Sequence, residues 1–171
     1  YAPNTNFTWW NDSNMGSGAV YIYKRTGTSW AQEAYIKASN NGLYDYFGSS
    51  VSVGGNRLAV GSTGEASSQT TITNGTTASF NNMSYGSGAV YIYKRTGTSW
   101  AQQAYIKAAN NDMSDNFGTS MAIDGDTLAV GAQNESSSLT TITNGTTASS
   151  DDSSMGSGAV YIYKRTGTSW A

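Results

Sequence analysis

A phrase of sixteen residues, GSGAVYIYKRTGTSWA, occurs three times in this chain. Its copies span 16–31, 86–101 and 156–171, so successive copies lie 70 residues apart (86 − 16 and 156 − 86). Residues 32–85 resemble 102–155 along their whole length, so the phrase marks a tandem repeat. Self-similarity at a fixed period predicts a fold built from one supersecondary unit, in which each unit buries its faces against its neighbours.

Each period predicts short strands. Apolar residues alternate along 47–53, and Gly54-Gly55 then supplies the positive φ angles of a tight hairpin before a return strand at 58–61. The repeated phrase predicts a third strand at 19–23, rich in aromatic and β-branched residues. A fourth strand is expected from Trp30 to Ala38. Its inward positions are expected at Trp30, Ala34 and Ile36.

Four-stranded antiparallel units in tandem are the blades of a β-propeller. We therefore expect an all-β chain of about 2.4 blades (171/70), with strands that fall as two, then four, then three. The expected parts are 1–15, a non-repeat N-terminal segment; 16–46, the last two strands of a first blade; 47–116, a complete blade; and 117–171, a partial blade. A propeller closes with roughly four to eight blades, so this chain is incomplete on its own and is not expected to be a stable monomer.

A threonine-rich insert makes each period longer than a usual blade. The inserts, 70–79 and 140–149, are identical, and their Asn-Gly pairs predict a second hairpin that projects from the propeller. Two interpretations stay open: a displayed contact arm, or a solvated loop that packs on its neighbour. The residues expected to carry a contact arm are Ile72, Asn74, Ile142 and Asn144.

Composition limits the classes of function. The net charge is −2, and no basic stripe of the kind that binds nucleic acid is present. Cysteine and histidine are absent, which removes disulfides, Cys/His zinc sites and imidazole-based catalytic triads. No run of eighteen apolar residues occurs, so no membrane insertion is expected. The 12 Tyr and 5 Trp favour a folded chain over a disordered one.

Three elements of the repeat resemble the FG-GAP repeat, which builds the seven-bladed propeller of integrin α subunits and of many bacterial surface proteins. The elements are, in the first copy, Phe47-Gly48, 58–61 and 88–93, and, in the second, Phe117-Gly118, 128–131 and 158–161. The resemblance covers about 16–171 and is expected to be closest to the bacterial members. It implies a propeller and an extracellular or cell-surface location.

The chain departs from this family at one loop. Many members hold calcium in an acidic Asp-x-Asp-x-Asp-Gly loop between the first two strands, where this chain has only Gly54-Gly55-Asn56 and Asp124-Gly125-Asp126. Calcium takes about six to eight oxygen ligands, so we expect no metal site and no other cofactor. Asp45 and Asp115 precede Phe-Gly in the two copies and are interpreted as turn formers rather than a catalytic pair. No catalytic residue and no enzyme activity are expected.

Aromatic side chains and glycosylation sequons are the remaining candidates. Packing between blades explains Tyr21, Tyr23, Trp30, Tyr35 and their copies better than stacking on sugars does. Acceptors for N-glycosylation, in a host that carries the machinery, are expected at Asn6, Asn11, Asn74, Asn82, Asn134 and Asn144.

The N-terminal segment does not align with the repeat. Phe7, Trp9 and Trp10 are a large apolar load for a terminus, which suggests docking on a blade edge of the same or a neighbouring chain. Alternatively, the segment is a tail ordered only by incidental contacts. If it docks, deletion of residues 1–10 is expected to weaken self-association.

Two functions fit these observations. One is a non-enzymatic extracellular structural or assembly repeat module, which forms part of a β-propeller or a head-to-tail filament. The alternative is an adhesin- or lectin-like propeller that binds a protein or glycan ligand through its loop face. Identical loops in successive blades favour the first function, because a specific site usually needs non-identical neighbours. The expected partner is the chain itself, as a homo-oligomer or filament, or further blades of a longer chain.

Overall fold

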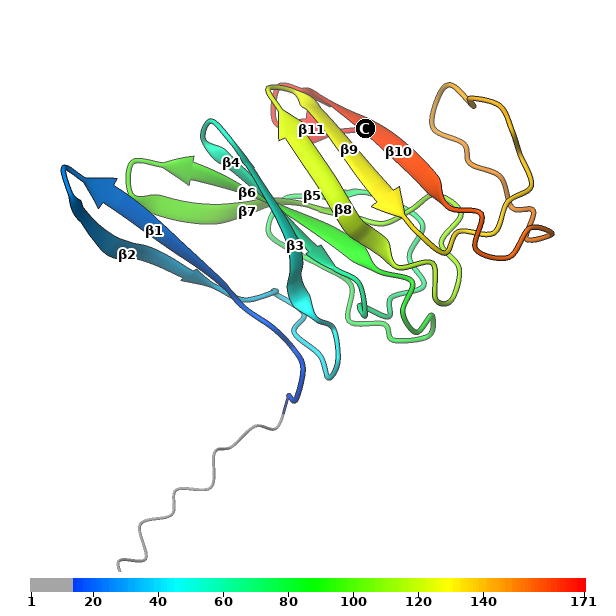
Figure 1. Ribbon diagram of the computed structural model, residues 1–171, viewed down its shortest axis with the longest axis horizontal. Coiled ribbons are helices and arrows are strands. Elements are labelled where there is room, and N and C mark those ends of the chain that lie inside the picture. Colours follow the sequence, from blue (N-terminus) through cyan, green and yellow to red (C-terminus); the bar gives the residue numbers. More distant parts are fainter. Residues whose placement is uncertain (1–13) are drawn as a thin grey trace, which may run out of the picture.

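A computed structural model of the chain describes residues 14–171, and these residues contain no helix. Three antiparallel sheets follow one another along the chain and lie side by side (Figure 1). Blade 1 is the hairpin of β1 (Val20–Thr26) and β2 (Ser29–Ile36). Blade 2 holds β3 (Phe47–Gly54), β4 (Arg57–Ser62), β6 (Ala89–Thr96) and β7 (Ser99–Ile106), with β5 (Thr73–Asn74) at its edge. Blade 3 holds β8 (Phe117–Asp124), β9 (Thr127–Ala132), β10 (Ala159–Thr166) and β11 (Ser169–Trp170).

The all-β architecture of blade-like units expected from the sequence is confirmed, and the sheets do not close into a ring. The expected strands of two, four and three are present, and the two-residue strands β5 and β11 are additional. The hairpin of blade 2 forms where it is expected, but its turn lies one residue later than Gly54-Gly55: Gly54 pairs with Arg57, so Gly55 and Asn56 are the turn residues, and of these only Gly55 has a positive φ, of 58°. Glycine adopts this left-handed conformation without the clash that a Cβ would create.

The two hydrophobic cores lie between blades. In the first core, the aliphatic side of blade 1, with Val20 and Ile36, packs on the side of blade 2 that carries Tyr91, Tyr93 and Tyr105. Phe47 meets the ring of Tyr91 edge-on, with the ring centroids 5.2 Å apart. In the second core, the opposite side of blade 2 packs on blade 3. That core includes Val90, Ile92, Ala104, Ile106, Phe117, Leu128, Val130 and Tyr163. Each blade therefore has an aliphatic side and a tyrosine side, and successive blades join one to the other.

The threonine-rich insert differs from the projecting hairpin that the sequence suggests. In blade 2, Thr73 and Asn74 pair antiparallel with Tyr105 and Ala104 of β7, so the insert forms a fifth strand along the outer edge. The unpaired backbone N–H and C=O groups of an open edge strand can bond to an added strand of this kind. The identical insert at 140–149 forms no strand. The counterpart of β7 in blade 3 is β11, which extends only over Ser169–Trp170 and therefore offers no comparable edge.

Candidate functional site

The junction between blades accounts for two elements of the repeat: the Phe-Gly element (Phe47-Gly48 and Phe117-Gly118) and the Gly-Ala element (Gly18-Ala19 and Gly88-Ala89). Gly88 forms an isolated parallel bridge with Phe117 of the next blade, and Gly18 forms the same bridge with Phe47. The two backbone segments approach so closely that a Cβ on Gly88 would lie 2.2 Å from the Phe117 carbonyl oxygen. Only glycine permits this approach, and Gly88 also has a φ of +84°. The Phe-Gly element of one blade is thus held by the Gly-Ala element of the blade before it.

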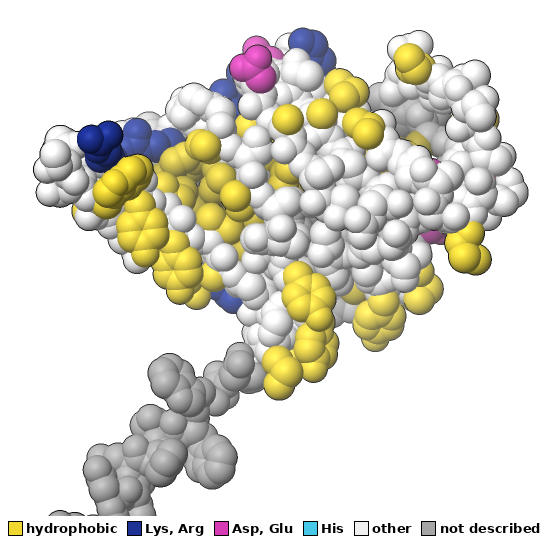
Figure 2. Space-filling view, in the orientation of Figure 1, with side chains coloured by type: hydrophobic (Ala, Val, Ile, Leu, Met, Phe, Trp, Pro, Cys, Tyr) yellow, Lys and Arg dark blue, Asp and Glu magenta, His cyan; other side chains and the backbone are white. Residues whose placement is uncertain are grey.

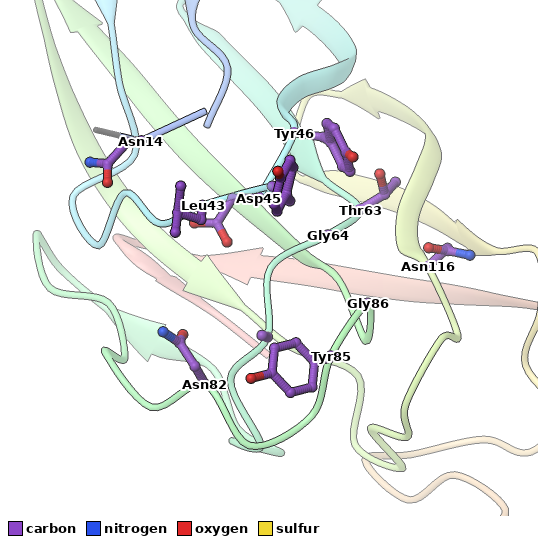
Figure 3. Close-up of a pocket in the computed structure, with 12 residues that line it drawn as sticks. Asn14, Leu43, Asp45, Tyr46, Thr63, Gly64, Asn82, Tyr85, Gly86 and Asn116 are labelled. Atoms are coloured by element: carbon purple, nitrogen blue, oxygen red, sulfur yellow. The ribbon is translucent and has the colours of Figure 1, made fainter. Parts of the chain in front are cut away.

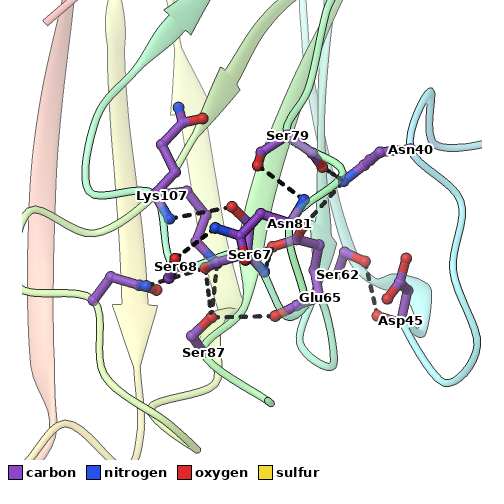
Figure 4. Close-up of polar contacts among 12 residues, drawn as sticks. Asn40, Asp45, Ser62, Glu65, Ser67, Ser68, Ser79, Asn81, Ser87 and Lys107 are labelled. Carbon is purple, nitrogen blue, oxygen red and sulfur yellow. Dashed lines mark hydrogen bonds and ion pairs between the residues drawn. The ribbon is translucent and has the colours of Figure 1, made fainter. Parts of the chain in front are cut away.

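A buried ion pair lies behind this junction in blade 2 (Figure 4). Lys107 Nζ lies 2.9 Å from Glu65 Oε2, and the two side chains are 0% and 1% exposed. Lys107 also donates to Ser87 Oγ at 2.7 Å, and the Ser67 amide donates to Glu65 Oε2 at 3.1 Å. Burial lowers the pKa of the Lys107 ammonium, and the Glu65 carboxylate opposes that shift. Because the Lys107 ammonium is fully desolvated, loss of these partners would destabilise the fold.

The same network ties blade 1 to blade 2. Asn40, which follows β2, donates from Nδ2 to Glu65 Oε1 at 3.0 Å and accepts from the Tyr91 hydroxyl at 2.5 Å. The second junction repeats this arrangement: Asn110 donates to Glu135 Oε1 at 2.9 Å and accepts from Tyr161 at 2.6 Å. Lys107 has no counterpart beside Glu135 among residues 14–171. This network was not predicted from the sequence, where its only signal is a Glu and a Lys at matching places in both copies.

The two outer blade faces repeat residues that are buried inside the molecule. Tyr21, Tyr23 and Tyr35 of blade 1, here called the tyrosine face, are each more than half exposed. Their counterparts 70 residues later are buried against blade 1. At the other end, Val160 and Ile162, here called the aliphatic face, are 70% and 63% exposed. Figure 2 shows hydrophobic side chains gathered over the end of the molecule formed by β1 and β2.

A hollow of about 690 Å³, here called the loop-face hollow, opens among the loops at the blade ends. Figure 3 shows the loop with Tyr46 across the hollow from the loop with Asn82 and Tyr85, and Tyr44 also lines the hollow. The remaining lining residues are Asn14, Leu43, Asp45, Thr63, Gly64, Ala66, Gly86 and Asn116. These residues were not predicted as a site from the sequence.

The buried aspartates in these loops are turn formers, as expected. The Gly42 amide donates to Asp45 Oδ2 at 2.7 Å, and the Asp112 amide donates to Asp115 Oδ2 at 3.1 Å. Burial raises the pKa of Asp45 and raises that of Asp115 to about 6. The two carboxylates occupy equivalent places in successive blades rather than one shared site.

The residues expected to act as sites lie in different environments. Asn74 is engaged with the next blade, because Trp170 N–H donates to Asn74 Oδ1 at 2.9 Å. Ile72 packs partly buried against the second core, whereas Ile142 and Asn144 are exposed. Asn82 lines the loop-face hollow, and Asn134 donates to the Ser114 carbonyl at 3.1 Å. The expected sites that lie outside the described residues are Asn6, Asn11, Phe7, Trp9 and Trp10.

The turns that hold calcium in many family members are short hairpin turns here. Asp126, in the turn between β8 and β9, is paired with the Arg165 guanidinium. Within 14–171, no three Asp or Glu residues gather as a metal site would require. Over the same residues, no helix has the length and apolarity to cross a membrane.

The stacked four-stranded units, the bridged Phe-Gly and Gly-Ala elements and the two-sided blades define a β-propeller-type repeat module. A family model for the FG-GAP repeat matches residues 30–93 and again 100–163, and the chain belongs to this family. Proteins with this repeat are generally non-enzymatic and typically extracellular or at the cell surface. No curated protein matches the chain.

Proposed function

We propose that this chain is a non-enzymatic structural repeat module of extracellular or cell-surface proteins, which works by stacking blade on blade. The supporting observation is the pair of outer faces. The tyrosine face of blade 1 and the aliphatic face of blade 3 carry the two residue sets that join blades internally. Each outer face therefore matches the other, and the partner is a second copy of this chain or a further blade of the same kind.

Burial of these faces gives the driving force for stacking. Val90 and Ile92, the internal counterparts of Val160 and Ile162, are fully buried. Full burial of one aliphatic side chain contributes about 1.5–3 kcal/mol relative to exposure. A heterologous contact of this kind closes a ring if the rotation between units permits, and otherwise continues as a filament.

Light scattering on the isolated 171-residue chain tests the proposal. We expect particles well above the chain mass of 18.0 kDa. Ile162→Asp places a carboxylate on the aliphatic face and should lower the mass, whereas Met155→Asp, in the loop before β10, should not. A folded, monodisperse particle of one chain mass would refute the stacking function.

A further inference from the structure

The two inter-blade junctions differ at their loop ends, although their cores are nearly the same. The first repeat has Tyr44, Tyr46, Gly64, Asn82 and Tyr85, where the second has Ser114, Asn116, Asn134, Asp152 and Met155. All five residues of the first set line the loop-face hollow. These five substitutions, among those that break the symmetry of the repeat, therefore lie together around one hollow.

Two of these tyrosines sit in an unfavourable backbone conformation. Tyr44 has a φ of 59° and Tyr46 a φ of 53°, a region that bulky residues rarely occupy. Their counterparts Ser114 and Asn116 have similar angles, and Asn is the side chain that tolerates them best. Both residues are about half exposed, so packing offsets only part of this cost. Backbone strain that is retained at partly exposed residues is characteristic of functional positions.

Gly64 opens the hollow. A Cβ at this position would lie 1.9 Å from the Tyr44 carbonyl oxygen, so glycine lets the tyrosine loop lie closer to this strand end than a residue with a side chain would. At the second junction the same position is Asn134, whose side chain donates to the Ser114 carbonyl at 3.1 Å. The second junction is thus filled by an amide where the first is open.

The lining chemistry suits an uncharged polyhydroxylated ligand. The rings of Tyr44 and Tyr46 lie 6.3 Å apart at 46° and present an aromatic platform. Asn82, Asn116 and the tyrosine hydroxyls both donate and accept hydrogen bonds, as a sugar hydroxyl requires. Among residues 14–171, no Lys or Arg lines the hollow, and the one charged residue there, Asp45, is buried and acidic, which disfavours an anion. The volume is within the range of about 300–1,000 Å³ typical of ligand sites.

We propose that the loop-face hollow is a binding site for a neutral oligosaccharide. The rings of Tyr44, Tyr46 and Tyr85 pack against the apolar faces of the sugar rings, and the amides of Asn82 and Asn116 pair with the sugar hydroxyls. This site is independent of blade stacking, because its residues lie at the loop ends and not on the tyrosine face or the aliphatic face.

Titration of the full 171-residue chain with maltohexaose, cellohexaose and chitohexaose tests the proposal, by saturation-transfer NMR and calorimetry. At least one of these neutral hexasaccharides should bind. The double variant Tyr44→Ser/Tyr46→Asn, which installs the residues of the second junction, should weaken binding at least tenfold. Phe80→Ser is the matched control: it also exchanges an exposed aromatic residue for the serine of the other repeat, but Phe80 does not line the hollow.

Thermal unfolding separates loss of the site from loss of the fold. Tyr44→Ser/Tyr46→Asn should melt at the same temperature as the parent chain or higher, because it relieves two strained tyrosines. A tenfold loss of affinity with unchanged or raised melting temperature supports the site. Failure of all three saccharides to bind, equal affinity in the double variant, or binding of an anionic heparin hexasaccharide alone would overturn the proposal.

Discussion

Replacing Lys107 by Met is the sharpest test of how successive blades are held together. The substitution keeps the length of the side chain and removes the ammonium that lies 2.9 Å from Glu65 Oε2. Breaking a buried ion pair by removal of one partner costs about 3–5 kcal/mol, because the other charge stays buried. Glu65 keeps two donors, Asn40 Nδ2 and the Ser67 amide. We therefore expect the lower end, about 3 kcal/mol in the free energy of unfolding.

Lys37→Met is the matched control, since Lys37 is the same residue of the preceding repeat. Lys37 is partly buried and donates to Ser17 Oγ at 2.7 Å and to the Gly18 carbonyl at 2.5 Å. It pairs with no carboxylate among residues 14–171. Removal of its hydrogen bonds should cost about 1 kcal/mol.

Urea unfolding followed by circular dichroism, together with thermal melting, measures both variants. A loss of about 3 kcal/mol corresponds to a fall of roughly 6–12 °C in melting temperature for a chain of this size. The double variant Glu65→Gln/Lys107→Met removes both charges and should be more stable than Lys107→Met alone. Equal losses for Lys107→Met and Lys37→Met, or a double variant less stable than Lys107→Met alone, would refute the role assigned to the pair.

Three further perturbations have defined outcomes. Gly88→Ala forces a Cβ to within 2.2 Å of the Phe117 carbonyl oxygen and should lower the free energy of unfolding by about 2–5 kcal/mol. The control Gly97→Ala has open space around it and should cost only about 1–2 kcal/mol, because of its positive φ. Similar losses for the two variants in urea unfolding would count against the close approach. Folding raises the pKa of Asp115 from 3.8 to about 6, so the native state holds this proton more tightly than the unfolded chain does. Stability should therefore fall as the pH rises from about 4 to 7. Asp115→Asn should reduce this dependence of the melting temperature on pH. Addition of EDTA should leave the melting temperature unchanged, and a rise of several degrees with calcium would show that a metal site had been missed.

Strand positions were predictable because they depend on local alternation and turn chemistry. The apolar alternation of 47–53 and the Gly54-Gly55 turn predict a hairpin, and the structure has β3 and β4 there within a residue or two at each end. The second copy keeps this alternation at 117–123 with several different residues, so it supports the same prediction independently. The pairing of blade edges with inserts was not predictable in this way, because it depends on which neighbour is present.

The burial of the repeated residues shows most clearly what could not be predicted from the sequence. Trp30 was expected to face inward but is 67% exposed, whereas Trp170, in the same phrase, is only 2% exposed. Trp170 lies beside the insert of blade 2, where its backbone pairs with Asn74, and it belongs to the second core. Trp30 is not in either core. Because the sequence around both residues is identical, no local pattern distinguishes them, and only the tertiary neighbour decides.

The repeat also separates positions that the fold needs from positions that are available for recognition. At the junctions, a backbone approach as close as that of Gly88 to Phe117 excludes any side chain, so the two copies must agree there. At the loop ends the two copies differ, and the first copy keeps Tyr44 and Tyr46 at positive φ with about half of each residue exposed. Strain at such positions costs about 1–3 kcal/mol per residue. A Ser and an Asn accommodate the same backbone in the other copy. The fold covers only about half of each tyrosine, so burial offsets only part of this cost, and the oligosaccharide proposed for the hollow would contribute the remainder on binding.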